Sequence, residues 1–393
     1  MRRVYLDNNA TTEVAPEVMG AMLPCYREFY GNASSVHWYG QEAKALMDKA
    51  RQQVATLLNA EPNEIVFTSG GTESDNLAIR GIVDSVPGTG KHIITSQIEH
   101  HAVLHTGQML QKLGIKVTYV PVDAEGLVDP AEIEKSITPE TVLISIMHSN
   151  NEIGAIQPVQ EIGAIARARD IYFHTDAVQA AGKVPLDVEQ LGVDLLSIAG
   201  HKFHAPKGVG ALYIKKGTKI RSLLYGGAHE RNRRAGTENI PHIVGLGKAS
   251  ELAMTEMENN TGRILELRNY FEGETFRRIP HTSLNGPRTR RIPNTANIRF
   301  EQVESEALLI NLDLAGVACS TGSACASGSI EPSHVLTALG LPPEQAFSSI
   351  RFSLSKFTTR EEIEYVLNLL PEMVGRLREM SHQHNKSFVM RGE

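Results

Sequence analysis

Short apolar runs alternate with helical stripes along the first two thirds of the chain. One stripe occupies residues 41–58, where the apolar positions of one helix face are Ala43, Met47, Ala50, Val54 and Leu57. The β-branched run EIVFT follows at 64–68, and further apolar runs of strand length begin at residues 92, 116, 141, 171 and 194. Helical patterns over 103–113 and 158–169 separate these runs. The alternation predicts an α/β fold with a mainly parallel sheet flanked by helices.

The pattern changes after about residue 260. In chain order it predicts a long polar helix, the strand NTANIRFE, a helix over SEALLINLDLAG and the strand SSIRFSLS. The sequence Thr359-x-x-Glu362 has the form of a capping box and predicts the start of a final helix. Helices and strands that are segregated in this way are typical of an α+β domain.

The length of the chain suggests two domains. Single hydrophobic cores stop growing at roughly 250 to 300 residues, and this chain has 393. We expect a large domain over residues 16–258 and a smaller α+β domain that combines residues 1–15 with 259–393. The Ser/Gly-rich stretch STGSACASGS predicts a mobile loop of the smaller domain, at about 318–333.

Composition and charge narrow the class of function. The chain is 41% hydrophobic and 21% charged, as in ordinary globular proteins, and its net charge is −6 at pH 7. Broad binding to nucleic acid or to an anionic membrane needs a basic excess, so we expect neither partner. No apolar run approaches the roughly 20 residues that cross a bilayer, and we see no signal-type segment. We therefore expect a protein of the cytoplasm with small-molecule or protein partners.

The chain has three cysteines, Cys25, Cys319 and Cys325. Their number is odd and they form no Cys-x-x-Cys zinc pattern, which fits a reducing compartment better than a disulfide framework. We therefore predict thiol chemistry and no metal site.

Polar residues that follow the predicted strands suggest a cofactor site. Ligands of open α/β sheets bind beyond the carboxyl ends of the strands. Gly71 and Thr72 begin a helix there, where free N–H groups favour a phosphate. Asp176 ends the run at 171, and Lys202 follows the run at 194. Pyridoxal 5'-phosphate (PLP) needs an amine for its aldehyde and a carboxylate for its ring nitrogen, so this pair predicts a PLP site.

Eight motifs together resemble the cysteine desulfurases of the NifS/IscS type. They are DNNATT, SGGTESDN, EHHAV, HSNNEIG, HTDAVQ, GHKFHAPKG, RRAGTEN and SGSAC, and the resemblance extends over essentially the whole chain. It implies the fold of class-V aminotransferases, which are fold-type-I PLP-dependent transferases with a large and a small domain. It also implies a homodimer with each active site at the subunit interface.

The same resemblance assigns residues to the cofactor ring. Lys202 would bind the cofactor aldehyde covalently, Asp176 would hold the ring nitrogen and Gln179 would bond the ring hydroxyl. His100 would stack on the ring and move protons, and Asn151 would lie near the ring and the substrate.

The phosphate would be held by Thr72, His201 and, from the second copy in the dimer, Thr237. The family usually has Ser two residues before this histidine, whereas this chain has Ala199. We expect one fewer phosphate hydrogen bond, worth roughly 1 kcal/mol of cofactor affinity, and no loss of function.

Cys325 is the predicted nucleophile. It lies in the polar Ser/Gly loop, where a thiol can be exposed and can move between substrate and acceptor. The resemblance implies that it carries a persulfide taken from L-cysteine, with alanine as the other product, and that Arg351 clamps the substrate carboxylate. The sulfur would pass to an acceptor protein such as an iron–sulfur scaffold. We expect Cys25 and Cys319 to be structural.

Other functions stay open from sequence. The same fold supports aminotransferases and selenocysteine lyases, because fold alone does not fix chemistry. Cys325 in a Ser/Gly loop argues against an aminotransferase, which has no use for that thiol. A catalytically idle scaffold for iron–sulfur assembly is the non-enzymatic alternative, and the joint presence of Lys202, Asp176 and Cys325 argues against it. The motifs GTESDN and RRAGTEN resemble the nitrogen-fixation branch more closely. Housekeeping iron–sulfur assembly and sulfur supply to thiolated tRNA or cofactors stay open.

Overall fold

A computed structural model describes residues 2–321 and 331–389. The elements up to residue 214 are β1 (Val4–Tyr5), α1 (Pro16–Arg27), α2 (Trp38–Leu58), β2 (Ile65–Thr68), α3 (Gly71–Ser85), β3 (His92–Ser96), α4 (His101–Lys112), β4 (Lys116–Val120), α5 (Pro130–Ser136), β5 (Thr141–Ser145), α6 (Val159–Ala168), β6 (Tyr172–Asp176), α7 (Val188–Leu191), β7 (Leu195–Ala199) and β8 (Gly210–Ile214). The later elements are α8 (Ile240–Arg278), β9 (Thr282–Leu284), β10 (Thr295–Phe300), α9 (Ser305–Leu314), β11 (Val317–Ala318), α10 (His334–Ala338), α11 (Pro343–Ala346), β12 (Ser349–Ser353) and α12 (Arg360–Val389).

The largest sheet has the strand order β2-β8-β7-β6-β5-β3-β4. All its neighbouring pairs are parallel except those of β8, which runs antiparallel to both β2 and β7. The predicted α/β fold with a mainly parallel sheet is therefore confirmed. Strand β8 was not predicted, because its five residues GALYI follow the turn-rich GHKFHAPKGV without a helix between.

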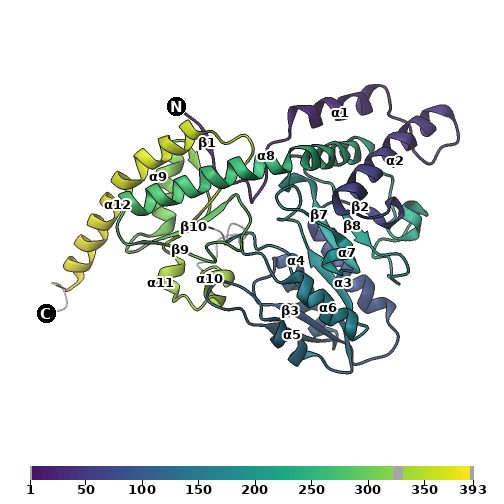
Figure 1. Ribbon diagram of the computed structural model, residues 1–393, viewed down its shortest axis with the longest axis horizontal. Helices are drawn as coiled ribbons and strands as arrows, with labels where there is room; N and C mark the ends of the chain where they lie inside the picture. Colours follow the sequence, from purple (N-terminus) through teal and green to yellow (C-terminus); the bar gives the residue numbers. More distant parts are fainter. Residues whose placement is uncertain (1, 322–330, 390–393) are drawn as a thin grey trace.

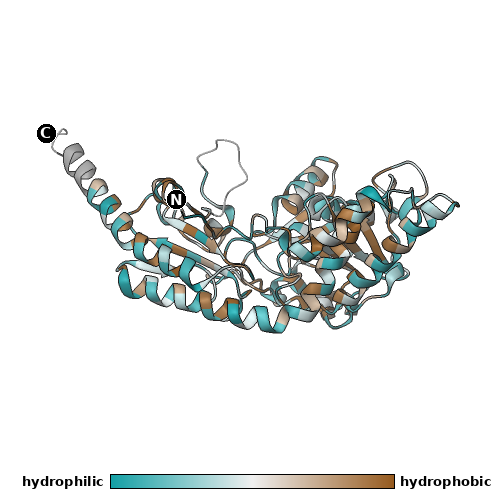
Figure 2. Ribbon diagram, turned by 90° about the horizontal axis from the view of Figure 1, so that it is seen from above, coloured by the Kyte–Doolittle hydropathy of each residue, from teal (hydrophilic) through white to brown (hydrophobic). Residues whose placement is uncertain are grey.

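Helices cover both faces of this sheet (Figure 1). Successive residues of a strand point to opposite faces, and β2 shows this directly. Ile65 and Phe67 enter the core that also contains α1, α2 and α6, whereas Val66 enters the core beneath α3 and α4. In Figure 2 the apolar colour concentrates on these buried strands, and the helices turn polar faces outward.

A second, antiparallel sheet has the order β12-β10-β9 and its own hydrophobic core with α8, α9 and α12. The N-terminal strand β1 pairs with β11, so the first residues of the chain lie with this sheet. The predicted capping box is present at the start of α12, where Glu362 N donates to Thr359 Oγ1 at 3.2 Å and Thr359 N donates to Glu362 Oε2 at 2.8 Å.

Helix α8 joins the two cores. It begins at Ile240, about 20 residues before the polar helix that the sequence pattern suggests, and it continues unbroken to Arg278. Its first part packs on α1 and α2, and its second part enters the core of the three-stranded sheet (Figure 1). The expected division at residue 258 falls inside this helix, and the division into domains stays a prediction. In the part of the chain described, no helix is long and apolar enough to cross a membrane.

Candidate active site

A cavity of about 440 Å³ opens beyond the carboxyl ends of β5, β6 and β7. Most of the residues predicted to form the site line it, namely Gly71, Thr72, His100, Asn151, Asp176, Gln179, His201, Lys202 and Arg351. Thr237 is exposed and lies outside the lining. Cys325 falls in the range 322–330, which lies outside the described residues. The topology of the sheet explains why residues from distant parts of the chain meet at this cavity, because parallel strands bring their carboxyl ends to one edge.

Lys202 reaches the cavity from a single 3₁₀ turn, Gly200–Lys202, directly after β7. Its Nζ donates hydrogen bonds to the backbone oxygens of Asn9, at 2.7 Å, and Ala10, at 2.8 Å. The amine is therefore held against the N-terminal segment that carries the DNNATT motif. Asn9 is itself fixed, because its Nδ2 donates to Asn151 O at 3.0 Å and to Thr295 Oγ1 at 2.8 Å.

Asp176 is the last residue of β6 and is buried. Its Oδ1 accepts the N–H of Val178 at 2.9 Å, so Oδ2 is the oxygen that can meet a ligand. Burial raises the pKa of Asp176 to about 6, against the opposing effects of the Val178 hydrogen bond and the Lys202 charge. A protonated ring nitrogen bound at Oδ2 would supply the positive partner that favours the ionised carboxylate.

A second buried carboxyl group, Asp75, lines the same cavity and was missed by the sequence reasoning. It lies on α3, and its Oδ1 is 3.6 Å from the Nε2 of His174 without a hydrogen bond. Burial, and then the charge of Asp176, raise the pKa of Asp75 well above its ordinary value. Its position four residues after Gly71, on the helix face that meets the sheet, is a sequence signal that could have located it.

His100 is the N-cap of α4, and its Nδ1 accepts the N–H of Ala102 at 3.1 Å. Burial and the nearby charge of Lys202 lower the pKa of His100 to about 4, so the ring is neutral near pH 7. Because Nδ1 is an acceptor, the proton of the neutral ring lies on Nε2. A flat, neutral imidazole of this kind can stack on an aromatic ring and exchange a proton at Nε2.

The N-terminus of α3 is shaped for a phosphate. The 15-residue helix begins at Gly71, and a Cβ built there would lie 2.8 Å from Val178 Cγ2, so a larger residue would crowd the cavity. Its free N–H groups and dipole favour an anion, and Thr72 and His201 lie on the same wall. Ala199 also lines this wall and offers no hydroxyl, as the sequence suggested.

The segment that contains Thr237 meets the rim of the cavity through another residue. Arg234 Nε donates to Glu73 Oε1 at 2.8 Å, and Glu73 lies in the first turn of α3. This pair brings the RRAGTEN motif to the N-terminal end of α3, while the exposed Thr237 side chain lies on the surface of the molecule.

Arg351, on β12, forms the far wall of the cavity and is buried. Its Nη2 donates to Asp7 Oδ1 at 2.7 Å, and its Nη1 donates to Asn151 O at 3.0 Å. The Nε has no hydrogen-bond partner among the described residues. The guanidinium is thus held through Nη1 and Nη2, each of which has a second N–H group that could meet an added carboxylate. The sequence did not predict a role for Asp7, because no sequence pattern relates it to Arg351, which lies more than three hundred positions away.

The described residues on the two sides of the segment that contains Cys325 are connected to this cavity in different ways. Before the segment, Ser320 N donates to Arg351 O at 3.2 Å. After it, Glu331, Pro332, Ser333 and His334 line the cavity. Ser333 Oγ donates to Glu152 Oε2 at 2.5 Å, which ties the returning chain to the HSNNEIG motif.

The other two cysteines are free thiols: Cys25 lies in the core of the large sheet, and Cys319 packs against the core of the three-stranded sheet. Cys25 is buried on α1, and burial raises the pKa of its thiol. Burial, and then the charge of Asp7, raise the pKa of Cys319 far above its ordinary value. A thiol that resists ionisation is a poor nucleophile, so neither cysteine is suited to attack sulfur.

Comparisons with known proteins give consistent matches. The family model Aminotransferase class-V matches residues 4–366. "Cysteine desulfurase IscS" of Dictyoglomus turgidum is 54% identical over 380 residues, which covers 97% of this chain and 96% of the relative. "Cysteine desulfurase IscS" of Methanosarcina thermophila is 55% identical over 387 residues, with coverages of 98% and 96%.

Solved structures agree with these matches. A "NifS-like protein" has a TM-score of 0.90 at 40% identity, and the match covers 96% of this chain and 100% of that chain. "SspA in complex with cysteine" has a TM-score of 0.80 at 37% identity, with coverages of 91% and 100%. The cavity and both sheets that frame it lie within the matched region.

Proposed function

Since the chain belongs to the class-V aminotransferase family, we propose that it is a cysteine desulfurase, which takes sulfur from L-cysteine and releases L-alanine. The observation that carries the proposal is the joint presence of Lys202, Asp176 and Arg351 on one cavity. An amine, a buried carboxylate and a guanidinium at these places suit PLP and an amino-acid substrate.

Members of this family are PLP-dependent, and the residues of the cavity fit that cofactor. Lys202 would bind its aldehyde, Asp176 Oδ2 its ring nitrogen and Gln179 its ring oxygen, while His100 would stack on its ring. The phosphate would lie at the N-terminus of α3, against Gly71, Thr72 and His201, with Thr237 of the partner subunit as a further ligand. When bound, PLP supplies an electron sink for the negative charge that develops at the substrate Cα.

The protein groups then bind the substrate and move its protons. Arg351 would hold the carboxylate of L-cysteine, with Asn151 beside it. The amine of Lys202 would take the Cα proton. To do so, the amine would give up one or both of its hydrogen bonds to the Asn9 and Ala10 carbonyls, or keep them while it accepts the proton. Neutral His100 would exchange a proton at Nε2 with the substrate thiol, or with the substrate Cβ once sulfur has left it.

Cys325 would accept the sulfur. Its thiolate attacks the substrate sulfur, an S–S bond forms, the Cβ–S bond breaks, and the electron pair left on Cβ is protonated to give alanine. The products are alanine and a Cys325 persulfide, so no external oxidant or reductant is needed. The contact of Ser320 with Arg351 and the lining of the cavity by Ser333 support this role, because both flanks of the segment reach the substrate-binding wall.

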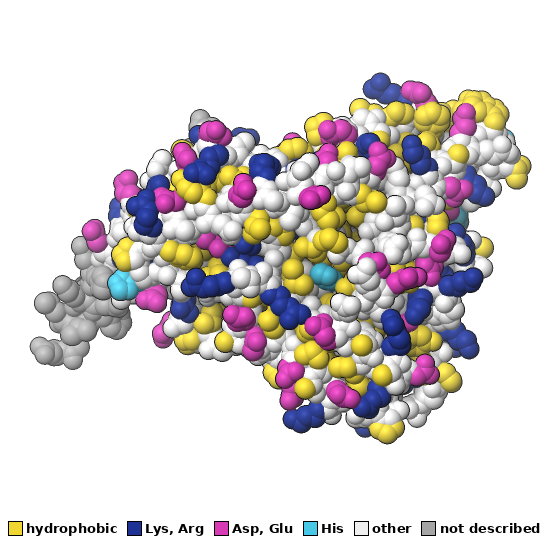
Figure 3. Space-filling view, viewed as in Figure 1, with side chains coloured by type: hydrophobic (Ala, Val, Ile, Leu, Met, Phe, Trp, Pro, Cys, Tyr) yellow, Lys and Arg dark blue, Asp and Glu magenta, His cyan; other side chains and the backbone are white. Residues whose placement is uncertain are grey.

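We also propose a homodimer. Large apolar side chains are exposed along α1, the connection that follows it and the start of α2, and include Leu23, Tyr26, Tyr30, Val36 and Trp38. In Figure 3 yellow side chains gather over this corner of the molecule, at the upper right. Exposed apolar clusters of this kind commonly mark protein interfaces. The exposed Thr237 is then available to a second copy, as the proposed phosphate site requires.

The acceptor of the sulfur would be a protein, such as an iron–sulfur scaffold, in the cytoplasm. The two described cysteines are free thiols, which suits a reducing compartment. The test is turnover of L-cysteine by the PLP-loaded protein, with alanine and sulfide measured in the presence of a thiol. Alanine in amounts equal to sulfide supports a desulfurase, whereas a keto acid product would indicate an aminotransferase. A strong preference for L-selenocysteine over L-cysteine would indicate a selenocysteine lyase.

A further inference from the structure

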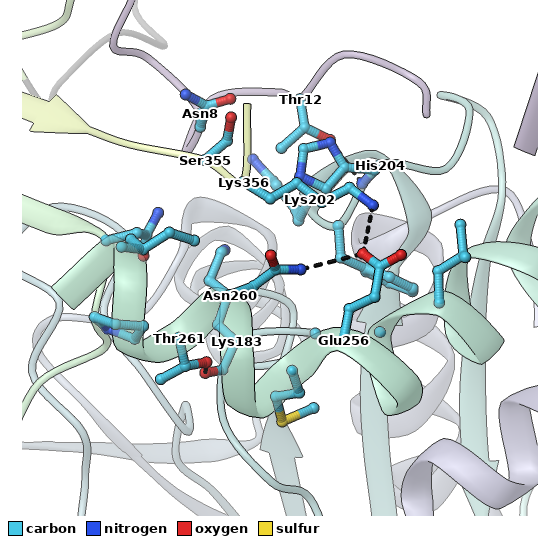
Figure 4. Close-up of a pocket in the computed structure, with 18 of the residues that line it drawn as sticks. Asn8, Thr12, Lys183, Lys202, His204, Glu256, Asn260, Thr261, Ser355 and Lys356 are labelled. Atoms are coloured by element: carbon cyan, nitrogen blue, oxygen red, sulfur yellow. Dashed lines mark hydrogen bonds and ion pairs between the residues drawn. The ribbon is translucent and has the colours of Figure 1, made fainter. Parts of the chain in front are cut away.

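Lys183 is a lysine behind the candidate active site that none of the proposed steps uses. It follows β6 and lines a second cavity of about 50 Å³, on whose wall Lys202 also lies (Figure 4). Its backbone oxygen accepts a hydrogen bond from Thr261 Oγ1 at 3.0 Å, which anchors this turn to α8. On another part of the wall Lys356 pairs with Glu256 at 2.8 Å (Figure 4).

The amine of Lys183 is directed at Gln179. Its Nζ donates to Gln179 Oε1 at 3.0 Å and to Gln179 O at 3.1 Å. Gln179 is buried, and its Nε2 donates to the backbone oxygen of Asn9 at 2.9 Å. A backbone oxygen can only accept, so the Nε2 end of the amide faces Asn9 O, and the Lys183 amine then meets the Oε1 end. These two partners therefore fix which end of the Gln179 amide is oxygen and which is nitrogen.

The fixed amide has a consequence for the larger cavity. Gln179 lines that cavity, and the second hydrogen of its Nε2 is the donor that it can present there. The same Asn9 oxygen also accepts from Lys202 at 2.7 Å. Lys183, Gln179, Asn9 and Lys202 thus form one connected series of hydrogen bonds. Burial, followed by the charges of Lys202 and Arg351, lowers the pKa of Lys183 to about 7.

We propose that Lys183 is a positioning residue that holds Gln179 with its N–H group toward the ring oxygen of the bound cofactor. The inference rests on the proposed function, because it takes the ligand of Gln179 to be PLP. Lys183 acts at the Oε1 end of the amide, so it also polarises the N–H at the other end. It has no contact with substrate or cofactor in this arrangement.

The test compares Lys183→Met with Lys183→Arg. Methionine keeps the length of the side chain and removes the donor, whereas arginine keeps a donor and the charge. We expect Lys183→Met to bind PLP roughly two- to tenfold more weakly in equilibrium dialysis, as for one lost hydrogen bond. It should also change the visible absorbance of the PLP-loaded protein at fixed pH and lower kcat more than it raises KM. Lys183→Arg should restore most of each property.

A matched control and a double variant separate positioning from other effects. Lys356→Met removes a lysine from the same small cavity, yet it should leave PLP affinity and absorbance unchanged, because Lys356 bonds Glu256 and not Gln179. In a Gln179→Ala background, Lys183→Met should add no further change. If Lys183→Met does not fold, Lys183→Ala provides the same removal of the donor.

Two outcomes would overturn the inference. One is a Lys183→Met protein with wild-type PLP affinity and absorbance. The other is a Lys183→Met substitution that lowers PLP affinity as much in the Gln179→Ala background as in the wild type. The proposed function is judged separately, by alanine release from the wild-type protein. If the wild type releases no alanine, dialysis with PLP still tests the role of Lys183.

Discussion

Arg351 donates a hydrogen bond to Asp7 at 2.7 Å, which joins β12 of the small sheet to the N-terminal segment. Arg351 is 2% exposed, and its guanidinium also donates to Asn151 O, so the group is fixed before any substrate arrives. A preorganised guanidinium loses little freedom when it binds a carboxylate.

Arg351→Ala should therefore weaken the binding of L-cysteine while it leaves PLP content intact. A charge-assisted contact to a carboxylate is worth roughly 1.5 to 3 kcal/mol, which corresponds to a rise in KM of about ten- to 150-fold. The measurement is steady-state alanine release with PLP content determined on the same sample. Arg299→Ala, on the neighbouring strand β10 and outside the cavity lining, is the matched control. A wild-type KM for Arg351→Ala would refute the proposed role.

Lys202→Ala should lose the covalently bound cofactor, because the aldehyde needs this amine. Borohydride reduction followed by mass spectrometry of the intact protein measures the covalent adduct. Lys356→Ala, which changes another lysine near the site, should keep the adduct. Fixation of PLP to Lys202→Ala at the wild-type level would show that another lysine bears the cofactor.

Ala199→Ser should strengthen PLP binding, since Ala199 lies on the wall that we propose binds the phosphate, and a hydroxyl there adds one donor. One hydrogen bond of about 1 kcal/mol corresponds to roughly fivefold in the dissociation constant. Equilibrium dialysis measures the change, and Ala177→Ser, a buried alanine outside the cavity lining, serves as control. Weaker binding of PLP by Ala199→Ser would mean that the wall has no room for the hydroxyl.

Glu99 should make the stability of the protein depend on pH. Burial raises the pKa of Glu99 to about 8, despite hydrogen bonds from Ser96 and from the N–H of Met147, whereas the unfolded chain has a pKa of about 4.3. The folded state therefore holds this proton more tightly than the unfolded chain does. The resulting stabilisation of the folded state is complete below about pH 4.3, and it is lost as the pH rises to about 8.

Glu99→Gln cannot ionise. Its free energy of unfolding relative to the wild type should rise between about pH 4.3 and 8, by up to a few kcal/mol, and then level off. Urea unfolding of the protein without PLP at several pH values gives this difference. Glu125→Gln, at an exposed turn, should show a flat difference over the same range. A flat difference for Glu99→Gln as well would show that Glu99 is ionised in the folded protein.

The sequence was sufficient for much of the fold and for the residues at the strand ends. Periodicity located β3, β5, β6 and β7, and the rule that ligands bind beyond the carboxyl ends of parallel strands then selected Asp176 and Lys202. The family resemblance that added Gln179 and Arg351 was confirmed as to family, while the roles of these residues stay predictions.

Other features depend on contacts between distant segments. The pairing of Asp7 with Arg351 and the bond from Lys202 to Asn9 O arise only when the N-terminal segment folds across both sheets. Asp75 was missed because a carboxyl group in a helical pattern is ordinarily exposed. The start of α8 was missed because its first turns pack on α1 and α2, which the local polar pattern does not reveal.

The central claim is that Cys325 accepts sulfur while the cavity around Lys202 processes the substrate carbon. Cys325→Ser and Cys325→Ala remove the thiol, which is the only group that we propose accepts the substrate sulfur. Serine cannot replace cysteine, because a hydroxyl is hardly ionised near pH 7, whereas a thiol with a pKa of about 8.5 is already several per cent thiolate. The two other cysteines provide matched controls, since burial raises the pKa of both Cys25 and Cys319.

The most direct measurement is alanine release from L-cysteine by the PLP-loaded wild type, Cys325→Ser, Cys25→Ser and Cys319→Ser. We predict that Cys325→Ser keeps its PLP absorbance and still responds to added L-cysteine, yet releases no alanine above background. The other two variants should turn over at rates close to that of the wild type. Substantial alanine release by Cys325→Ser, with loss of activity in Cys25→Ser or Cys319→Ser, would contradict the account.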